Sequence, residues 1–477
     1  MSAPALWIAA EAAQATGGAN SAEWAAGGVS IDSRTLAPGD LFVALAGPNF
    51  DGHDFMAKAF RAGAAAAVAH RTPEAAELPE TAPILLVDDT MTALRALGAA
   101  ARERSGARFI GVTGSVGKTG TKEGLARCLA AQAPTAASAG SLNNHWGLPL
   151  SLARMARDAN YGVFELGMNH PGEIRELTAL LHPGVALITN VEAAHIGYFA
   201  SIEEIAAAKA EIFEGMGADG VAVLNRDNPF FEHLAEKAKA AGLARIIGFG
   251  QNAQAEVRLT DCTLEAGGSR VSAEVLGVRL DYRVGLPGTH WVTNSLAVLA
   301  AIAAVGADPA AAAAELARIE PGKARGERHL IDLPGGELTL IDDSYNANPT
   351  SMRAAFEVLG RAELGADGRR IAVLGDMLEL GAQAAEMHED LAEPLNSAGV
   401  DLVFTCGADM AALNAALPTA MRGGHAAGSQ VLVPLVTASV GAGDVVLVKG
   451  SAGSRMGRVV EALKGMAGAL PRAANGE

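Results

Sequence analysis

The residues with the clearest chemical potential lie in one short stretch, G-V-T-G-S-V-G-K-T at 111–119. Its end matches the phosphate-binding loop G-x-x-x-x-G-K-[ST], in which backbone N–H groups and the lysine hold phosphates and the hydroxyl binds Mg²⁺. The first glycine of that pattern is absent because position 112 is valine, although glycines stand at 111 and 114. We therefore predict a phosphate loop of a less common form, built from Thr113, Gly114, Ser115, Val116, Gly117, Lys118 and Thr119.

The segments around this loop are those that a phosphate loop requires. R-F-I-G-V (108–112) is typical of a buried strand, and a helix is expected from Lys118 onward. In that helix, Leu125, Cys128 and Leu129 are spaced i, i+3, i+4 and form the expected buried stripe. A helix N-terminus favours phosphate oxygens because it presents free N–H groups and the positive end of the helix dipole.

Polar residues at the ends of two later strand-like runs extend this predicted site. Glu165 lies at the end of Y-G-V-F-E-L (161–166), Asn190 ends V-A-L-I-T-N, and His195 follows in the next turn. Ligands of parallel α/β sheets bind beyond the carboxyl ends of the strands, where a carboxylate can hold a metal ion. The alternatives are a solvated strand end for Glu165 and a structural role for His195.

A lysine on an apolar helix face is a further unusual feature of this region. In I-A-A-A-K-A-E-I-F (205–213), Ile205 and Ile212 mark the buried side, and Lys209 is spaced to lie on it. Burying a charged amine is costly unless the group is paired or modified. The alternative is an aliphatic stem that is covered while the charge reaches water.

Length, charge and cysteine content exclude several classes of protein. The 477 residues suggest about three domains at roughly 150 residues each. The formal charge of −16 argues against broad nucleic-acid binding, which needs a basic surface. The three cysteines are far apart and form no local metal pattern, which fits a reducing compartment. Because no signal peptide or membrane-length apolar run is present, we expect a cytoplasmic enzyme or switch without membrane insertion.

The distribution of strand and helix signals predicts an α/β protein of three domains, at 1–105, 106–320 and 321–477. In the middle region, short apolar runs alternate with helical segments, which indicates a parallel sheet with crossover helices. The stretch 255–285 alternates apolar and polar residues and predicts an antiparallel addition. The last region repeats the alternation with runs at 337–343, 370–376, 401–407 and 444–450, so it forms a second α/β unit.

Taken together, these motifs resemble those of the Mur ligase family, ATP-dependent enzymes that build the bacterial cell-wall peptide. The resemblance rests on T-G-S-V-G-K-T (113–119), E-L-G-M-N (165–169), T-N-V-E-A-A-H (189–195) and A-K-A-E-I-F (208–213), and the family's loop has this G-x-x-G-K-T spacing. D-S-R-T-L-A-P-G-D-L-F-V-A-L (32–45) is similar to the uridine-nucleotide domain of two members, and I-D-D-S-Y-N-A-N-P-T-S-M (341–352) resembles the member that adds D-Ala-D-Ala. The resemblance implies an N-terminal uridine-nucleotide domain, a central phosphate-loop ATPase domain and a C-terminal Rossmann-like domain.

The resemblance also implies a reaction. ATP would convert a carboxylate of UDP-N-acetylmuramoyl-tripeptide to an acyl phosphate, and the amine of D-Ala-D-Ala would displace phosphate to form an amide. ATP and Mg²⁺ are the implied cofactors, and the family generally acts as monomers. Two alternatives stay open, a family member that adds a different amine and, from another class, a nucleotide-dependent switch. The third residue of the acceptor peptide stays undetermined.

The family's functional residues map onto matching positions of this chain. By resemblance, Thr119 and Glu165 hold one Mg²⁺, His195 helps to hold another, and Lys209 matches a lysine that is carbamylated in several members. The expected catalytic residues are Lys118, Asn143, Glu165, His195 and Lys209. The expected nucleotide contacts beyond the loop are Asn294, Arg325, Asp343 and Asn346, and the expected contacts to the uridine-linked substrate are Ser33, Arg34, Asn143 and Asn144.

Three positions depart from the family's pattern. Trp291 stands where the family often has an asparagine. We expect that the hydrogen bond of that asparagine is lost and that the indole packs near the base instead. Ala324 precedes Arg325 where the family has glycine, and Gly120 stands where relatives often have threonine.

Overall fold

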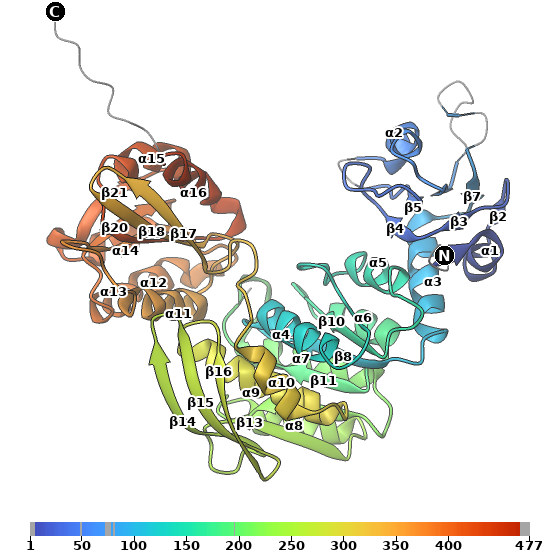
Figure 1. The fold of residues 1–477 in the computed structure, drawn as a ribbon, viewed down its shortest axis with the longest axis horizontal. Helices are drawn as coiled ribbons and strands as arrows, with labels where there is room; N and C mark the ends of the chain where they lie inside the picture. Colours follow the sequence, from blue (N-terminus) through green and yellow to red (C-terminus); the bar gives the residue numbers. More distant parts are fainter. Residues whose placement is uncertain (1–4, 48–49, 72–77, 80–81, 195, 468–477) are drawn as a thin grey trace, which may run out of the picture.

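The chain folds into three α/β units, each with its own sheet (Figure 1). The computed structural model describes residues 5–47, 50–71, 78–79, 82–194 and 196–467. The N-terminal and C-terminal units lie on opposite sides of the central unit. In the described residues, no helix combines the length and the apolar character that crossing a bilayer requires.

The N-terminal unit is a small sheet that shares its core with the central unit. Helix α3 (Thr90–Glu103) begins where the Asp89 carboxylate accepts the N–H of Thr92, and its apolar face packs on α5 (Gly147–Ala153) of the central unit. Leu150 and Ala153 of α5 therefore belong to the N-terminal core. The sheet has the order β2 (Ala19–Asn20), β7 (Ile84–Leu86), β6 (Ala66–Ala69), β5 (Asp40–Val43) and β4 (Gly28–Ser30), and beside it lie β1 (Trp7–Ile8), β3 (Ala25–Ala26), α1 (Ala9–Thr16), α2 (Met56–Arg61) and α3 (Thr90–Glu103).

The central unit is built on a nine-stranded sheet with helices on both faces. Its strands have the order β16 (Val278–Val284), β15 (Gly268–Val275), β14 (Val257–Glu265), β13 (Arg245–Gly250), β12 (Val221–Asn225), β11 (Val185–Ile188), β8 (Arg108–Thr113), β10 (Tyr161–Glu165) and β9 (Thr135–Ala137). One face packs against α4 (Lys118–Ala130), α9 (Thr289–Ala304) and α10 (Pro309–Leu316), and the other against α6 (Glu173–Leu181), α7 (Ile202–Ala210) and α8 (Phe231–Ala240). β14, β15 and β16 pair in antiparallel fashion, which confirms the addition predicted at 255–285.

The structure explains why position 112 needs no glycine. Val112 is the penultimate residue of β8, is fully buried, and pairs with Glu165 of β10 and Leu187 of β11. A β-branched residue suits the middle of a buried parallel strand. The glycines that the loop does need therefore come after the strand. The predicted stripe on the following helix, Leu125, Cys128 and Leu129, is also confirmed as fully buried.

The C-terminal unit repeats the α/β pattern with six strands. The order is β17 (Glu327–Leu333), β18 (Gly336–Asp343), β22 (Val445–Lys449), β19 (Arg370–Gly375), β20 (Leu402–Cys406) and β21 (Arg422–Ala426), with only β17 antiparallel to its neighbour. Its helices are α11 (Pro349–Gly360), α12 (Ala384–Glu389), α13 (Ala392–Ser397), α14 (Met410–Ala416), α15 (Ser429–Thr437) and α16 (Gly457–Lys464). A capping box between Asn348 and Ser351, with Pro349 in the first turn, fixes the start of α11 directly after the strand-end motif. The exact domain boundaries given by the sequence remain predictions.

Candidate active site

One cleft of about 700 Å³ brings most of the predicted site residues together. Its walls come from the central and the C-terminal units. The predicted residues that line it are Ser115, Val116, Gly117, Lys118, Thr119, Asn143, Glu165, Asn294, Arg325, Asp343 and Asn346. Segments that are more than 200 residues apart in the sequence thus meet around the phosphate loop.

Two glycines of the loop are required by its backbone path. Gly114 has a φ of +146°, and a Cβ there would lie 1.9 Å from the hydroxyl oxygen of Thr189. Gly117 has a φ of +81°, in the left-handed region that glycine adopts most easily. These conformations place the chain between β8 and α4 so that the first N–H groups of the helix face the cleft.

The loop is fixed on the end of the neighbouring strand β11 rather than left free. The Asn190 side-chain oxygen accepts the N–H of Val116 at 3.0 Å and that of Ser115 at 3.2 Å. The Thr189 hydroxyl donates to the carbonyl of Val116 at 2.6 Å. The sequence placed Asn190 at a strand end but did not identify it as the residue that holds the loop.

Lys118 begins helix α4 and folds back over the loop. Its amine donates to the carbonyl oxygens of Gly114 at 2.7 Å and Ser115 at 3.3 Å. Burial lowers the pKa of this amine, and the nearby Glu165 carboxylate opposes that shift. The amine therefore lies over the loop, as expected of a lysine that reaches phosphate oxygens in phosphate-loop proteins.

Glu165 and Thr119 form a pair of oxygen ligands on the floor of the cleft. The Thr119 hydroxyl donates to one carboxylate oxygen of Glu165 at 2.8 Å, and the Asn143 amide donates to the other at 2.7 Å. Glu165 is 1% exposed, so its charge is not offset by bulk water. A buried carboxylate beside a hydroxyl is a donor set that fits Mg²⁺, which prefers oxygen ligands.

Lys209 lies on the buried face of α7, as its spacing predicted. It is 3% exposed, and within the described part of the chain it forms no ion pair. Burial, helped by the positive charge of Lys118, holds the pKa of its amine well below the usual range. Lys209 does not line the cleft itself. His195 lies outside the described residues.

The C-terminal wall of the cleft centres on an ion pair whose lysine is buried. Asp343 ends β18, and the Lys449 amine at the end of the adjacent β22 donates to it at 2.7 Å and to the carbonyl of Asn346 at 2.9 Å. Burial raises the pKa of the Asp343 carboxyl, while Lys449 lowers it. Sequence reasoning placed Lys449 in the strand-like run at 444–450 but gave it no role in the site, although it stands at a strand end as Glu165 does.

Tyr345 connects the two walls. Its hydroxyl forms a hydrogen bond with the hydroxyl of Ser141 in the central unit. The Arg325 guanidinium carbon lies 3.8 Å from the centre of the Tyr345 ring, a cation–π distance. Arg325 is thereby held against the Tyr345 ring where it lines the cleft.

Besides Lys209, five predicted residues of the described chain do not line this cleft, and one of them is Gly114, which directly follows β8. Ser33 and Arg34 belong to the N-terminal unit, Thr113 is buried in β8, and the Asn144 side chain accepts the N–H of Gly147 at 2.9 Å to start α5. The contacts of Ser33, Arg34 and Asn144 with a uridine-linked substrate stay predictions.

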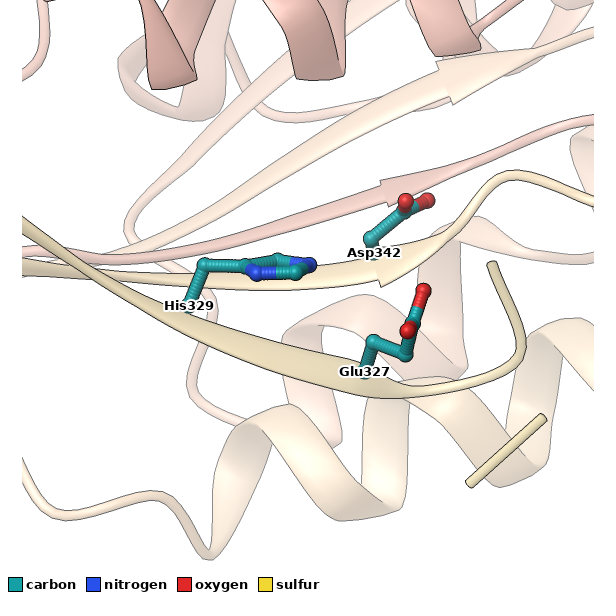
Figure 2. A group of neighbouring side chains, drawn as sticks. All are labelled: Glu327, His329 and Asp342. Carbon is teal, nitrogen blue, oxygen red and sulfur yellow. The ribbon is translucent and has the colours of Figure 1, made fainter. Parts of the chain in front are cut away.

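A second group of ligand-type side chains lies in the C-terminal unit, made of Glu327, His329 and Asp342 (Figure 2). One ligand atom from each lies within 4.8 Å of the others. Both carboxylates are already engaged, because Glu327 accepts the N–H of Ala324 at 2.8 Å and Asp342 accepts the N–H and hydroxyl of Ser344 at 3.1 Å and 2.6 Å. These contacts order the two turns that carry the C-terminal residues of the cleft.

Comparison with known proteins places this geometry in a family. Three family models match the chain, "Mur ligase family, catalytic domain" at residues 26–104, "Mur ligase middle domain" at 112–302 and "Mur ligase, glutamate ligase domain" at 327–452. A curated relative from Escherichia coli (strain K12), named UDP-N-acetylmuramoyl-tripeptide–D-alanyl-D-alanine ligase, is 37% identical over 91% of this chain and 93% of its own. This chain belongs to the Mur ligase family.

Solved structures agree with this assignment. A MurF from Acinetobacter baumannii superposes with a TM-score of 0.82 at 31% identity, covering 96% of this Mur ligase and 99% of that chain. A MurF from Thermotoga maritima, solved in complex with ADP, gives a TM-score of 0.73 at 28% identity, covering 92% and 97%. The predicted fold class, three α/β domains of the Mur ligase type, is therefore confirmed.

The structure gives a physical meaning to the alanine before Arg325. In this Mur ligase, Ala324 has a φ of +56°, a left-handed conformation that costs a residue with a Cβ roughly 1–2 kcal/mol. Two hydrogen bonds hold it there, from its N–H to Glu327 and from the N–H of Tyr345 to its carbonyl at 3.0 Å. Glycine adopts this conformation without that cost.

We therefore expect Ala324→Gly to stabilise the protein. Since glycine also loses about 0.5–1 kcal/mol more chain entropy on folding, the net gain is about 0.5–1 kcal/mol in the free energy of unfolding. Urea unfolding of the full chain measures it. Ala317→Gly is the matched control, because Ala317 has an ordinary φ of −65° and should lose stability. An equal or lower stability of Ala324→Gly would contradict the prediction.

Proposed function

We propose that this Mur ligase joins D-Ala-D-Ala to UDP-N-acetylmuramoyl-tripeptide in an ATP-dependent reaction of peptidoglycan precursor synthesis. The observation that carries the proposal is the cleft in which the phosphate loop and Glu165 face Asp343 and Lys449 of a second α/β unit. The choice of substrates rests on the relatives, whose names state this activity. A switch that only hydrolyses nucleotide does not require the C-terminal α/β unit that forms the second wall of the cleft.

The chemistry of the proposed reaction has two steps. The substrate carboxylate attacks the γ-phosphorus of ATP, the bond from that phosphorus to ADP breaks, and an acyl phosphate forms. The free amine of D-Ala-D-Ala then attacks the acyl carbon, phosphate leaves, and the amine loses a proton as the amide forms. The protein contributes mainly by positioning the reactants and neutralising charge.

Lys118 and the start of α4 hold the transferring phosphate in this proposal. The Lys118 amine exchanges its contacts with the loop carbonyls for phosphate oxygens. The N–H groups of the first helical turn and the helix dipole add positive potential. This group of donors is in place before the reaction, so little reorganisation is needed as charge builds up.

The C-terminal wall is proposed to close the nucleotide site. Arg325 faces the phosphates, while Asp343 and Asn346 contact the nucleotide. Lys449 acts through its hydrogen bonds to Asp343 and Asn346, which set the positions of those two groups. Asn294 contacts the nucleotide from the central unit.

Glu165 and Thr119 are the proposed ligands of one Mg²⁺, with Asn143 holding the carboxylate in place. When bound, the ion offsets charge on the phosphates. His195 is proposed to help to hold a second ion.

The unusual state of Lys209 supports the proposal that it is carbamylated. Only a neutral amine attacks CO₂, and burial favours the neutral form. The neutral amine nitrogen bonds to the carbon of CO₂ and releases one proton, which turns a buried amine into a carbamate whose negative oxygens suit Mg²⁺.

A carbamate at Lys209 is directly observable. With ¹³C-bicarbonate, the wild type should give a carbamate carbonyl signal in the NMR spectrum that is absent in Lys209→Met, and turnover of the variant should fall by about 10²-fold. Lys118→Met is the control and should keep the signal, although that amine also has a lowered pKa. A wild-type protein without the signal, or a signal that survives in Lys209→Met, would rule out the modification.

The uridine-linked end of the substrate is assigned to the N-terminal unit. Ser33 and Arg34 are the proposed contacts, with Asn143 and Asn144 facing the peptide. The Arg34 guanidinium donates to Asp32 at 2.7 Å and lowers the pKa of that carboxyl to about 2. A guanidinium is suited to bind a diphosphate in two-point contact. We also propose a cytoplasmic monomer, which light scattering of the purified protein tests.

A phosphate-release assay tests the proposed function. It supplies ATP, Mg²⁺ and UDP-N-acetylmuramoyl-tripeptide, with either D-Ala-D-Ala or a single amino acid as the amine. Release that requires both the tripeptide and D-Ala-D-Ala is expected. Release with ATP alone would favour a hydrolytic switch, and preference for a single amino acid would favour another ligase of the family.

A further inference from the structure

Glu327, His329 and Asp342 lie on one face of the hairpin formed by β17 and β18. Glu327 pairs directly with Asp342 in the antiparallel register, and His329 is two residues further along β17, so its side chain shares that face. Figure 2 shows the imidazole directed toward the space between the two carboxylates. Within the described parts of the chain, no other group of three His, Cys, Asp or Glu side chains brings its ligand atoms this close together.

The two carboxylates face each other without a compensating cation. Like charges that stand directly opposite on a strand pair destabilise it. Neither Glu327 nor Asp342 forms an ion pair with a described lysine or arginine, and the Lys449 amine on the next strand pairs with Asp343 instead. Asp342 is 5% exposed, so water screens its charge poorly. A bound metal ion would supply the missing positive charge.

Each of the three side chains keeps one ligand atom without a partner among the described residues. Glu327 accepts the N–H of Ala324 through Oε2, and Asp342 accepts both donors of Ser344 through Oδ1, so Oε1 of Glu327 and Oδ2 of Asp342 accept no hydrogen bond. The Nε2 atom of His329 is buried and also has no hydrogen-bond partner. Buried polar atoms without a partner are uncommon in native proteins, and a bound ion is one partner that accounts for them.

The spacing of these atoms suits an ion between them rather than a direct contact. One ligand atom from each side chain lies within 4.8 Å of the others. The imidazole is nevertheless too far from either carboxylate for an ion pair, which needs about 4 Å or less. Ligand atoms at about 2.0–2.2 Å from a zinc ion are up to about 4.4 Å apart, so small side-chain rotations bring all three into its coordination shell.

We propose that Glu327, His329 and Asp342 bind a divalent first-row transition-metal ion of the Zn²⁺ type. An imidazole nitrogen combined with carboxylate oxygens favours such ions, whereas Mg²⁺ prefers oxygen ligands and loses its waters reluctantly. The site therefore differs in chemistry from the proposed Mg²⁺ site on the floor of the cleft, and it does not depend on the ligase reaction. An ion there joins the start of β17 to the end of β18, where Asp343 lines the cleft.

Titration calorimetry with ZnCl₂ alone tests the site in the full chain, after treatment with a chelator and removal of any affinity tag. The wild type should bind Zn²⁺, and His329→Gln and Glu327→Gln should each weaken that binding by at least about 10-fold. Glutamine at 327 can still accept the N–H of Ala324, so the turn before β17 is retained. His425→Gln is the matched control and should bind as the wild type does, because His425 is exposed on β21 of the same unit.

Thermal unfolding gives a second measurement. Zn²⁺ should raise the unfolding temperature of the wild type, because an ion that binds only the folded chain stabilises it, and it should not do so in His329→Gln. Without Zn²⁺, His329→Gln should match the wild type in unfolding temperature and in phosphate release, which establishes that the variant is folded. If His329→Gln does not fold, Glu327→Gln provides the same comparison.

Three results would overturn the inference. The first is a wild type that binds no Zn²⁺, and the second is equal binding by the wild type and His329→Gln. The third is binding that is lost in Glu165→Gln but kept in His329→Gln, because it would place the ion in the cleft. None of these results bears on the proposed ligase reaction, which the phosphate-release assay tests separately.

Discussion

Lys118→Met is expected to reduce kcat for ligation by about 10³-fold, the size seen when a donor aimed at developing charge is removed. The Lys118 amine is held over the loop by two carbonyl oxygens, so it stands ready to accept the phosphate. Methionine keeps the length and apolar character of the stem but cannot donate. Since the N–H groups of the loop remain, nucleotide affinity should fall far less than kcat.

Steady-state phosphate release measures the loss of kcat, and titration with ADP measures the loss of nucleotide affinity. Lys239→Met is the matched control, because Lys239 is exposed on α8, away from the cleft. Both variants should unfold at the temperature of the wild type. A Lys118→Met protein with near-normal kcat would remove the loop lysine from the mechanism.

Glu165→Gln is expected to lower kcat by about 10²- to 10³-fold and to raise the Mg²⁺ concentration needed for half-maximal activity by more than about 10-fold. The substitution keeps the shape of a side chain that is 1% exposed, but it removes the charge that we propose holds the ion. It also brings an amide NH₂ against one of the two donors, Thr119 or Asn143, that now share the carboxylate.

The Mg²⁺ dependence separates a metal ligand from a merely structural acid. Asn143→Ala is the comparison, because it keeps the Glu165 carboxylate charged but removes one of its two hydrogen-bond donors. This variant should lower kcat by about 10-fold and should raise the Mg²⁺ requirement less than Glu165→Gln does. Equal Mg²⁺ requirements for Glu165→Gln and the wild type would show that Glu165 acts only through packing.

The parts of the site that sequence reasoning identified are those whose signal is local. The loop from Thr113 to Thr119 is a strand, a turn and a helix within a few residues, and Glu165 follows directly on an apolar strand. The buried position of Lys209 followed from helical spacing alone. Such features need no knowledge of which strands are neighbours.

The residues that were missed depend on strand order. Asn190 holds the loop because β11 lies next to β8, and Lys449 reaches Asp343 because β22 inserts beside β18 although about 100 residues separate them in the sequence. The close approach of the Trp291 ring to Gly120 likewise depends on the packing of α9 against α4. No periodicity in one segment contains that information.

Helix α5 has a consequence for how the two ends of a substrate communicate. Its residues Leu150 and Ala153 belong to the N-terminal core, and the Trp7 indole N–H donates to the carbonyl of Ala153 at 2.8 Å. The same helix begins four residues after Asn143, and the Asn143 amide donates a hydrogen bond to the Glu165 carboxylate. Leu148 and Leu152 of the same helix belong to the core of the central unit, so α5 joins the N-terminal core to the sheet that carries Glu165. If binding at the N-terminal unit changes affinity in the cleft through α5, binding in the cleft must change affinity at the N-terminal unit by the same factor.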